Sequence, residues 1–195
     1  ASRILVERPV FDEVRRRMAE RYAALRVSPA TDDLDVGPVI SPRQREIVQG
    51  FLAIARSTGL QVAAQAMLPA SLPAGGCYVP PTLLAPATGN HRLAQEEIFG
   101  PVQVMIPFDG EAEALAIANG TNYGLVAGVW TRDGGRQLRM ARKLHCGQVF
   151  INNYGAGGGI ELPFGGVKHS GHGREKGFEA LYGFSSLKTV AIKHD

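Results

Sequence analysis

The sequence predicts an α/β fold built on a doubly wound, mostly parallel open sheet. Short runs of β-favouring residues alternate along the chain with helical patterns, and this alternation is typical of strand-helix-strand units with parallel strands. The composition agrees, because hydrophobic residues make up 45% of the 195 positions and charged residues 20%. Disordered and fibrous classes are therefore disfavoured.

Helices are expected over residues 9–27, 41–59, 111–119 and 134–144. Pro9 suits a first helical turn, because its missing N–H costs nothing there. Ser41 offers a hydroxyl acceptor to the free amides of the second helix, and Gly59 can close its far end. Asp133 is expected to open the last of the four helices.

Short strands are expected at residues 4–6, 60–67, 78–84, 102–108, 125–131 and 148–152. Residues 185–193 alternate in a way that predicts one more strand, which lies beyond the main unit and can join a sheet of another subunit. The predicted organisation is therefore a main domain over residues 1–184, followed by a terminal strand segment, 185–195.

The charge pattern does not indicate a nucleic-acid partner. The net charge is +3, and the basic residues are scattered apart from the triplet Arg15–Arg17. This triplet suits the solvated face of a helix, and the alternative is a contact with an acidic partner.

Cysteine usage and the lack of a long apolar run predict a cytoplasmic protein without a membrane segment. Cys77 and Cys146 are too few for a disulfide framework in a chain of this length. No run approaches the roughly 18–20 apolar residues that span a bilayer, and the first residues lack the features of a signal peptide. The chain also starts without Met on an apolar run, which suggests a trimmed or cleaved polypeptide.

Generic catalytic and metal-binding motifs are absent from the sequence, including the P-loop, the serine-hydrolase elbow and common zinc patterns. His169 and His172 lie in a glycine-rich stretch, so a shared metal ion is not expected. Cys77 and Cys146 are expected to be structural thiols, because only His145, next to Cys146, is a nearby base. The glycine density of residues 155–177 predicts a structured loop that lines a site, since glycine permits positive φ and close backbone approach.

The most informative segment is residues 95–102, which read Gln-Glu-Glu-Ile-Phe-Gly-Pro-Val. A pair of carboxylates precedes an aromatic ring and a Gly-Pro turn that feeds a predicted strand. A carboxylate there can accept two hydrogen bonds from a ribose diol, while the ring packs against a flat heterocycle. A charged loop with a core phenylalanine is the alternative on physical grounds.

Several motifs, in order and spacing, resemble the aldehyde dehydrogenase superfamily. They are E-E-I-F-G-P-V at 96–102, N-Y-G-L at 122–125, V-F-I-N at 149–152, P-F-G-G-V-K-H-S-G at 163–171 and G-R-E at 173–175. Residues 2–6 also resemble the stretch directly downstream of that family's nucleophilic cysteine. The resemblance extends over essentially the whole chain and identifies it as a C-terminal catalytic and oligomerisation portion.

The resemblance implies oxidation of an aldehyde to a carboxylic acid with NAD or NADP. In this family a cysteine thiolate attacks the aldehyde, the thiohemiacetal gives hydride to the nicotinamide, and a glutamate activates the water that hydrolyses the thioester. That cysteine, that glutamate and the main cofactor domain would all lie upstream. The chain alone is therefore expected to be inactive.

By motif position, the residues assigned are Glu97, Phe99 and Gln44 for the cofactor, Phe164, Tyr154 and Asn152 for the substrate, and Glu175 for a proton relay. Glu97 would bind the nicotinamide ribose hydroxyls, and Phe99 would pack near the nicotinamide and orient it for hydride transfer. Residues 155–159 lack bulky or acidic side chains, which suggests a roomy substrate entrance.

The terminal strand resembles the family's oligomerisation strand, so a homodimer or homotetramer is expected. Two other functions stay open. One is a non-catalytic assembly or structural module, and the other is an acylating semialdehyde dehydrogenase that uses coenzyme A in place of water. The motifs at 96–101 and 163–171 favour the hydrolytic enzyme over the acylating one.

Overall fold

The computed structural model describes residues 2–155 and 159–195, and the chain divides into two compact units, residues 1–114 and 115–195. The boundary falls within helix α4 (Gly110–Asn119). The expected division between residues 184 and 185 stays a prediction. Part of the predicted substrate entrance, residues 156–158, lies outside the described residues.

The first unit contains a mostly parallel sheet. Its strands, in spatial order, are β1 (Arg3–Glu7), β4 (Val102–Phe108), β3 (Thr82–Leu84) and β2 (Val62–Gln65). Strand β4 runs parallel to both β1 and β3, whereas β2 pairs antiparallel with β3 at the edge. The α/β class with a parallel-dominated open sheet is therefore confirmed.

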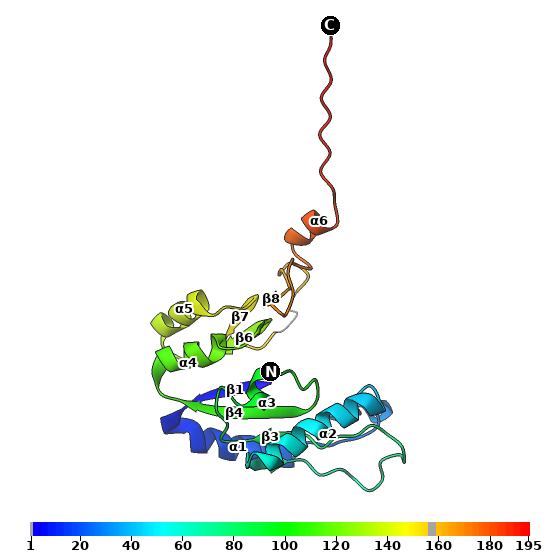
Figure 1. The fold of residues 1–195 in the computed structure, drawn as a ribbon, viewed down its shortest axis with the longest axis vertical. Helices are drawn as coiled ribbons and strands as arrows, with labels where there is room; N and C mark the ends of the chain where they lie inside the picture. The colour runs from blue at the N-terminus through cyan, green and yellow to red at the C-terminus, as the bar shows by residue number, and fades with distance from the viewer. Residues whose placement is uncertain (1, 156–158) are drawn as a thin grey trace. The chain divides into compact units, whose positions relative to one another are not determined.

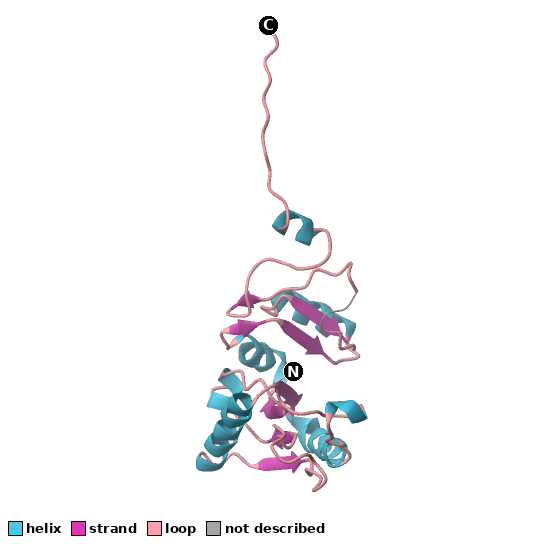
Figure 2. Cartoon of the chain, turned by 90° about the vertical axis from the view of Figure 1, so that its right-hand side faces the viewer, coloured by secondary structure: helices cyan, strands magenta, loops and turns pink. Residues whose placement is uncertain are grey.

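Both faces of this sheet are covered. Successive side chains of a strand point to opposite faces, and the neighbours Met105 and Ile106 on β4 are 0% and 1% exposed. Figure 2 shows helices on either side of the strands of this unit. Helix α1 (Phe11–Ala23), entered through a 3-10 turn at Arg8–Val10, packs on one face and shares a core with it.

Two predicted boundaries in this unit are wrong for identifiable reasons. The strand expected at residues 78–84 is confined to β3, because Pro80 and Pro81 carry no backbone N–H to donate to a ladder. The first helix ends at Ala23 and not at Val27. Val27 instead forms a parallel bridge with Val36 and is buried, so a tertiary contact replaces the last expected turn.

The predicted second helix is α2 (Pro42–Ser57), with Ser41 as its N-cap as expected. A 3-10 turn at Ala30–Asp32 and helix α3 (Arg92–Gln95) complete the helical segments of this unit. Helix α3 ends at Gln95, the first residue of the segment that the sequence singles out, and its Leu93 and Ala94 are buried. It therefore anchors the start of the candidate site.

The second unit contains two small sheets in its described residues. Strands β6 (Val126–Val129) and β7 (Gln148–Ile151) pair in parallel, and β5 (Tyr123–Gly124) pairs antiparallel with β8 (Val167–Lys168). Helix α5 (Gly134–Lys143) packs on β6, as Figure 1 shows, and Asp133 caps it as predicted. Helix α6 (Glu179–Gly183) follows the glycine-rich loop.

Residues 184–195 pair with no strand among the described residues, and every one of them is exposed. Leu187 is fully exposed, and Val190 and Ile192 are 72% exposed. A strand needs a neighbour to satisfy its backbone N–H and C=O groups. The predicted oligomerisation strand, which would find that neighbour in another subunit, therefore stays a prediction.

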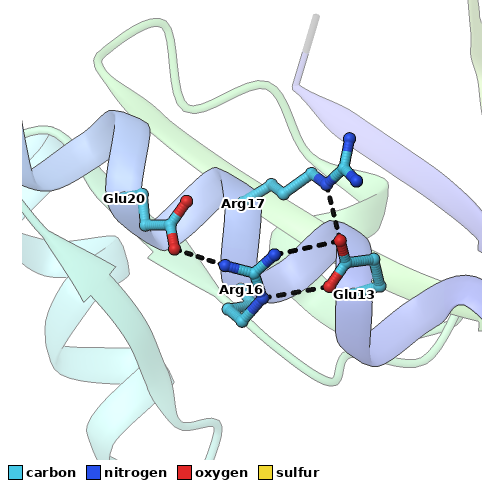
Figure 3. Close-up of polar contacts among 4 residues, drawn as sticks. All are labelled: Glu13, Arg16, Arg17 and Glu20. Atoms are coloured by element: carbon cyan, nitrogen blue, oxygen red, sulfur yellow. Dashed lines mark hydrogen bonds and ion pairs between the residues drawn. The ribbon is translucent and has the colours of Figure 1, made fainter.

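The arginine triplet lies on the solvent face of α1, as expected. Figure 3 shows Arg16 between Glu13 and Glu20, with Arg17 also bound to Glu13. The distance between Arg17 Nε and Glu13 Oε1 is 2.6 Å. Arg15 pairs with Asp12 at 3.0 Å. In these i,i+3 and i,i+4 ion pairs, the three arginines are paired with carboxylates of their own helix. Among the helices of the described chain, none combines the length and the apolar character of a membrane span.

Candidate functional site

The two carboxylates before the Gly-Pro turn have different surroundings. Glu96 accepts hydrogen bonds from the Arg92 guanidinium one turn earlier, with 2.7 Å between Arg92 Nε and Glu96 Oε1. These bonds hold the pKa of the Glu96 carboxyl below its ordinary value. Within the described residues, the carboxylate of Glu97 engages no side-chain or backbone donor. Glu97 is thus the carboxylate available to a ligand.

Phe99 stands out from the turn instead of entering the core. Its side chain is 72% exposed, whereas the preceding Ile98 is 2% exposed and anchors the turn. The alternative of a core phenylalanine is therefore wrong. The backbone of Phe99 is left-handed, with φ of +55°, a conformation that costs a non-glycine residue on the order of 1–3 kcal/mol. Other contacts must hold this conformation.

One such contact comes from Gln44 in the first turn of α2. Its Nε2 donates to the carbonyl oxygens of both Ile98 and Phe99, each at 3.0 Å. The backbone N–H of Gln44 donates to Ser41 Oγ at 3.2 Å, so the helix cap fixes the base of this side chain. The structure therefore brings Gln44 to the predicted site, where it contacts the turn itself.

A second contact is the packing of Gly100 against α2. A Cβ atom on Gly100 would lie 2.5 Å from Val48 Cγ2, so only glycine fits at this distance. The backbone then continues into β4, and Pro101 accepts a 2.9 Å hydrogen bond from the N–H of Thr82. The turn is thus held from α2 on one side and from β3 on the other.

Glu97 and Phe99 line one pocket of about 570 Å³. The lining residues are Ser2, Tyr22, Leu25, Val36, Pro81, Glu97, Phe99, Gly100, Pro101, Val102 and Gln103. Ser2 belongs to the stretch that resembles the one directly downstream of the family's cysteine, and its carbonyl accepts a 3.0 Å hydrogen bond from Val104 N. The pocket therefore joins the two segments that the resemblance connects with catalysis and the cofactor.

Tyr22 and Gln103 are pocket residues that the sequence did not reveal. Tyr22 lies on α1, and its hydroxyl donates to Gln103 Oε1 at 2.7 Å. Burial raises the pKa of Tyr22 to about 12. The hydrogen bond joins α1 to the start of β4, directly after the turn.

In the second unit, the glycine-rich loop depends on close backbone contacts, as its composition predicts. A Cβ on Gly147 would lie 1.6 Å from the carbonyl oxygen of Gly165, and one on Gly165 would lie 2.6 Å from that of Gly173. Ser170 Oγ accepts a 3.0 Å hydrogen bond from Gly124 N and ties the loop to β5. The described part of this segment is a structured loop.

This loop brings Phe164 and Glu175 together. Their backbones exchange two hydrogen bonds of 2.6 Å in an antiparallel bridge, and Lys176 Nζ lies 5.8 Å from the centre of the Phe164 ring. Phe164 is half-buried and Glu175 is exposed. Two of the predicted residues are therefore neighbours, although their roles stay predictions.

Asn152 and Tyr154 differ in how free their side chains are. The Asn152 amide exchanges two hydrogen bonds with the backbone of Thr131, both at 2.9 Å, and its own backbone has a φ of +51°. These bonds indicate that it shapes the end of β7. Tyr154 is 61% exposed and fits the predicted place near an entrance better.

Cys146 lacks the surroundings of a nucleophile. Cys146 is half-buried and donates from Sγ to the Gln148 carbonyl at 3.1 Å. Burial raises the pKa of this thiol, which disfavours the reactive thiolate. In the portion of the chain that the structure describes, no group of His, Cys, Asp and Glu residues could hold a metal ion.

Comparison with known proteins places these features in a family. The model of the aldehyde dehydrogenase family matches residues 1–190. A 2-aminomuconic semialdehyde dehydrogenase from Danio rerio is 40% identical over 198 residues, covering 99% of this chain and 40% of that protein. A betaine aldehyde dehydrogenase from Sinorhizobium fredii is 37% identical, covering 98% of this chain and 39% of that protein.

Solved structures agree. A candidate aldehyde dehydrogenase from Burkholderia cenocepacia is 57% identical with a TM-score of 0.96, covering all of this chain and 41% of that one. An aldehyde dehydrogenase from Mycobacterium tuberculosis complexed with NAD+ is 37% identical with a TM-score of 0.91, covering 98% of this chain and 39% of that one. This chain thus spans about two fifths of the length of the relatives it matches.

Proposed function

The chain belongs to the aldehyde dehydrogenase family, and from this premise we propose that it forms part of an enzyme that oxidises an aldehyde to a carboxylic acid with NAD or NADP. The observation that carries the proposal is one pocket that Ser2, Glu97 and Phe99 line together. It combines a carboxylate that engages no donor among the described residues, an exposed ring and the segment that resembles the one following the nucleophile.

The residues of this pocket fit a nicotinamide nucleotide. NAD or NADP supplies the hydride acceptor of the reaction when it is bound. The Glu97 carboxylate can accept hydrogen bonds from both hydroxyls of the nicotinamide ribose, because it engages no other donor in the described residues. The exposed Phe99 ring can pack on the nicotinamide plane. Together the two side chains orient the reactive ring.

The residues proposed to act on the substrate belong to the second unit. Phe164 lines the path of the aldehyde, Tyr154 lies near its entrance, and Glu175 passes a proton toward a general base outside this chain. The antiparallel bridge between Phe164 and Glu175 supports a shared site for these two residues. We also propose that residues 185–195 pair with a second subunit, since Leu187 there is fully exposed.

The test compares two adjacent carboxylates in the complete protein that carries this chain. Glu97→Gln should weaken NAD(P) binding about tenfold, because it loses charge-assisted hydrogen bonds to the ribose. Glu96→Gln is the matched control, since its carboxylate is already paired with Arg92. Titration calorimetry gives both dissociation constants. Equal affinities for the two variants would contradict the proposed role of Glu97.

The 195-residue chain by itself should form no NAD(P)H from any aldehyde. Burial raises the pKa of the Cys146 thiol, which disfavours its thiolate, and the proposed nucleophile lies outside this chain. A spectrophotometric assay of the isolated chain with betaine aldehyde and with 2-aminomuconic semialdehyde checks this expectation. Turnover that disappears in Cys77→Ser or Cys146→Ser would show that the chain contains its own nucleophile.

A further inference from the structure

We propose that Gln44 is a positioning residue: it clamps the backbone of the 97–99 turn in the conformation that presents Glu97 and Phe99 to the pocket. The inference rests on the proposed function for the identity of the ligand. The clamp itself rests on the geometry of the chain alone. Gln44 thereby acts on the cofactor through the turn and not by touching it.

The geometry of the clamp is specific. A single amide nitrogen has two hydrogens, and those of Gln44 Nε2 serve the carbonyl oxygens of two successive residues, Ile98 and Phe99, at 3.0 Å each. Successive carbonyls of an extended chain point in opposite directions. They can meet at one donor here because the backbone of Phe99 is left-handed. The clamp and the left-handed conformation therefore support each other.

The base of the clamp is rigid. Ser41 and Gln44 stand at the N-cap and N3 positions of α2, where a serine and a glutamine commonly bond to each other's backbone N–H. The Gln44 N–H does bind Ser41 Oγ, but the side-chain nitrogen extends to the turn, 54 residues away in sequence. Both of its hydrogens are used there, so it has none left to donate to a ligand.

The first experiment measures the turn without any ligand. Gln44→Met keeps the length of the side chain and removes the donor, and Gln44→Glu replaces the donor with an acceptor that repels both carbonyls. Gln49→Met is the control, because Gln49 is an exposed residue of the same helix. The hydrogen–deuterium exchange rates of the backbone amides in residues 96–102 are measured in the complete, cofactor-free protein. They should rise in both Gln44 variants and stay unchanged in the control. Unchanged exchange in the Gln44 variants would overturn the clamp.

The second experiment separates positioning from direct contact. Gln44→Met should raise both the dissociation constant and the KM for NAD(P) about tenfold, as expected for two lost neutral hydrogen bonds, and leave the KM for the aldehyde unchanged. In a Glu97→Gln/Phe99→Leu background, the same substitution should have no further effect, because the residues that it positions are already gone. A further loss of affinity in that background would show that Gln44 contacts the cofactor and would overturn the inference.

The two proposals fail in distinguishable ways. If Glu97→Gln/Phe99→Leu leaves the affinity for the cofactor unchanged, the proposed function of the pocket is wrong. The hydrogen–deuterium exchange rates of residues 96–102 then still decide whether Gln44 holds the turn. If that double variant loses affinity but Gln44→Met does not, the pocket is correctly assigned and the positioning role of Gln44 is wrong.

Discussion

The turn at residues 97–101 and the loop at residues 163–175 each present an acidic side chain and an aromatic ring, but different forces hold them. In the turn, side chains hold the backbone, since Gln44 binds two carbonyls and the buried Ile98 serves as an anchor. In the loop, backbone lies against backbone, because glycines remove the Cβ atoms that would separate the chains.

This difference determines which substitutions each region can tolerate. A side-chain contact can be weakened in steps or relieved by a compensating change, because side chains adopt other rotamers. A contact between two backbones has no such freedom, and any added atom must displace the chain. We therefore expect graded effects in the turn and abrupt ones in the loop.

The largest effect is expected from Gly147→Ala. The new Cβ would lie 1.6 Å from the Gly165 carbonyl oxygen, so the loop must move as a whole, which we expect to lower the free energy of unfolding by about 3 kcal/mol. Urea denaturation followed by circular dichroism gives this value. Gly134→Ala is the control, because nothing lies within 4 Å of the added atom. If the two variants are equally stable, backbone contact does not hold the loop.

A smaller effect is expected from Gly100→Ala, at about 1–2 kcal/mol, because the obstacle is the Val48 side chain. Val48→Ala should create the missing space. The double variant should then be more stable than the sum of the two single losses predicts, by about 1 kcal/mol. A double-mutant cycle of urea denaturations measures this coupling. If the two stability losses are strictly additive, the Val48 side chain is not what excludes a Cβ atom at Gly100, and the obstacle is the backbone, as at Gly147.

Tyr22→Phe should cost about 1 kcal/mol, since it removes the hydrogen bond to Gln103 at the base of the turn. It should also change the response to alkali. Burial raises the pKa of folded Tyr22 to about 12, above its ordinary value of 10.0, so the unfolded chain loses this proton first. The contribution of Tyr22 to stability is therefore complete below pH 10 and is lost as the pH rises toward 12.

Urea denaturation of both proteins at pH 8 and pH 11 checks this alkaline effect. The parent chain should lose more stability between the two pH values than Tyr22→Phe does. An equal loss in the two proteins would mean that Tyr22 is not protected from ionisation in the folded state.

The smallest effect is expected from Arg16→Ala on α1. Its ion pairs with Glu13 and Glu20 in Figure 3 join side chains that are about half exposed or more, and exposed pairs of this kind contribute little. The melting temperature should stay within experimental error, and raising the salt concentration should affect both proteins equally. A clear drop in the melting temperature of Arg16→Ala would show that these exposed ion pairs do stabilise α1.

Features that depend on near neighbours in sequence were predictable. The starts of α2 and α5 were found because Ser41 and Asp133 cap amides only three residues away. Strand β4 has the predicted bounds, Val102–Phe108, because a Gly-Pro turn precedes a run that is apolar except for Gln103. Strands β5 and β8 were not predicted, because two residues each are too few to show a periodic pattern.

The sequence by itself determined the α/β class, most of the helices and the segment at residues 95–102, because periodicity, caps and turn residues act within a few positions. Only the tertiary structure decided that Glu96 is paired while Glu97 engages no donor among the described residues. It also decided that the backbone of Phe99 is left-handed, that its ring is exposed, and that Gln44 holds the backbone of this turn. The clamp joins residues more than fifty positions apart. No local propensity encodes such a contact, which forms only when α2 and the turn before β4 pack in the same unit.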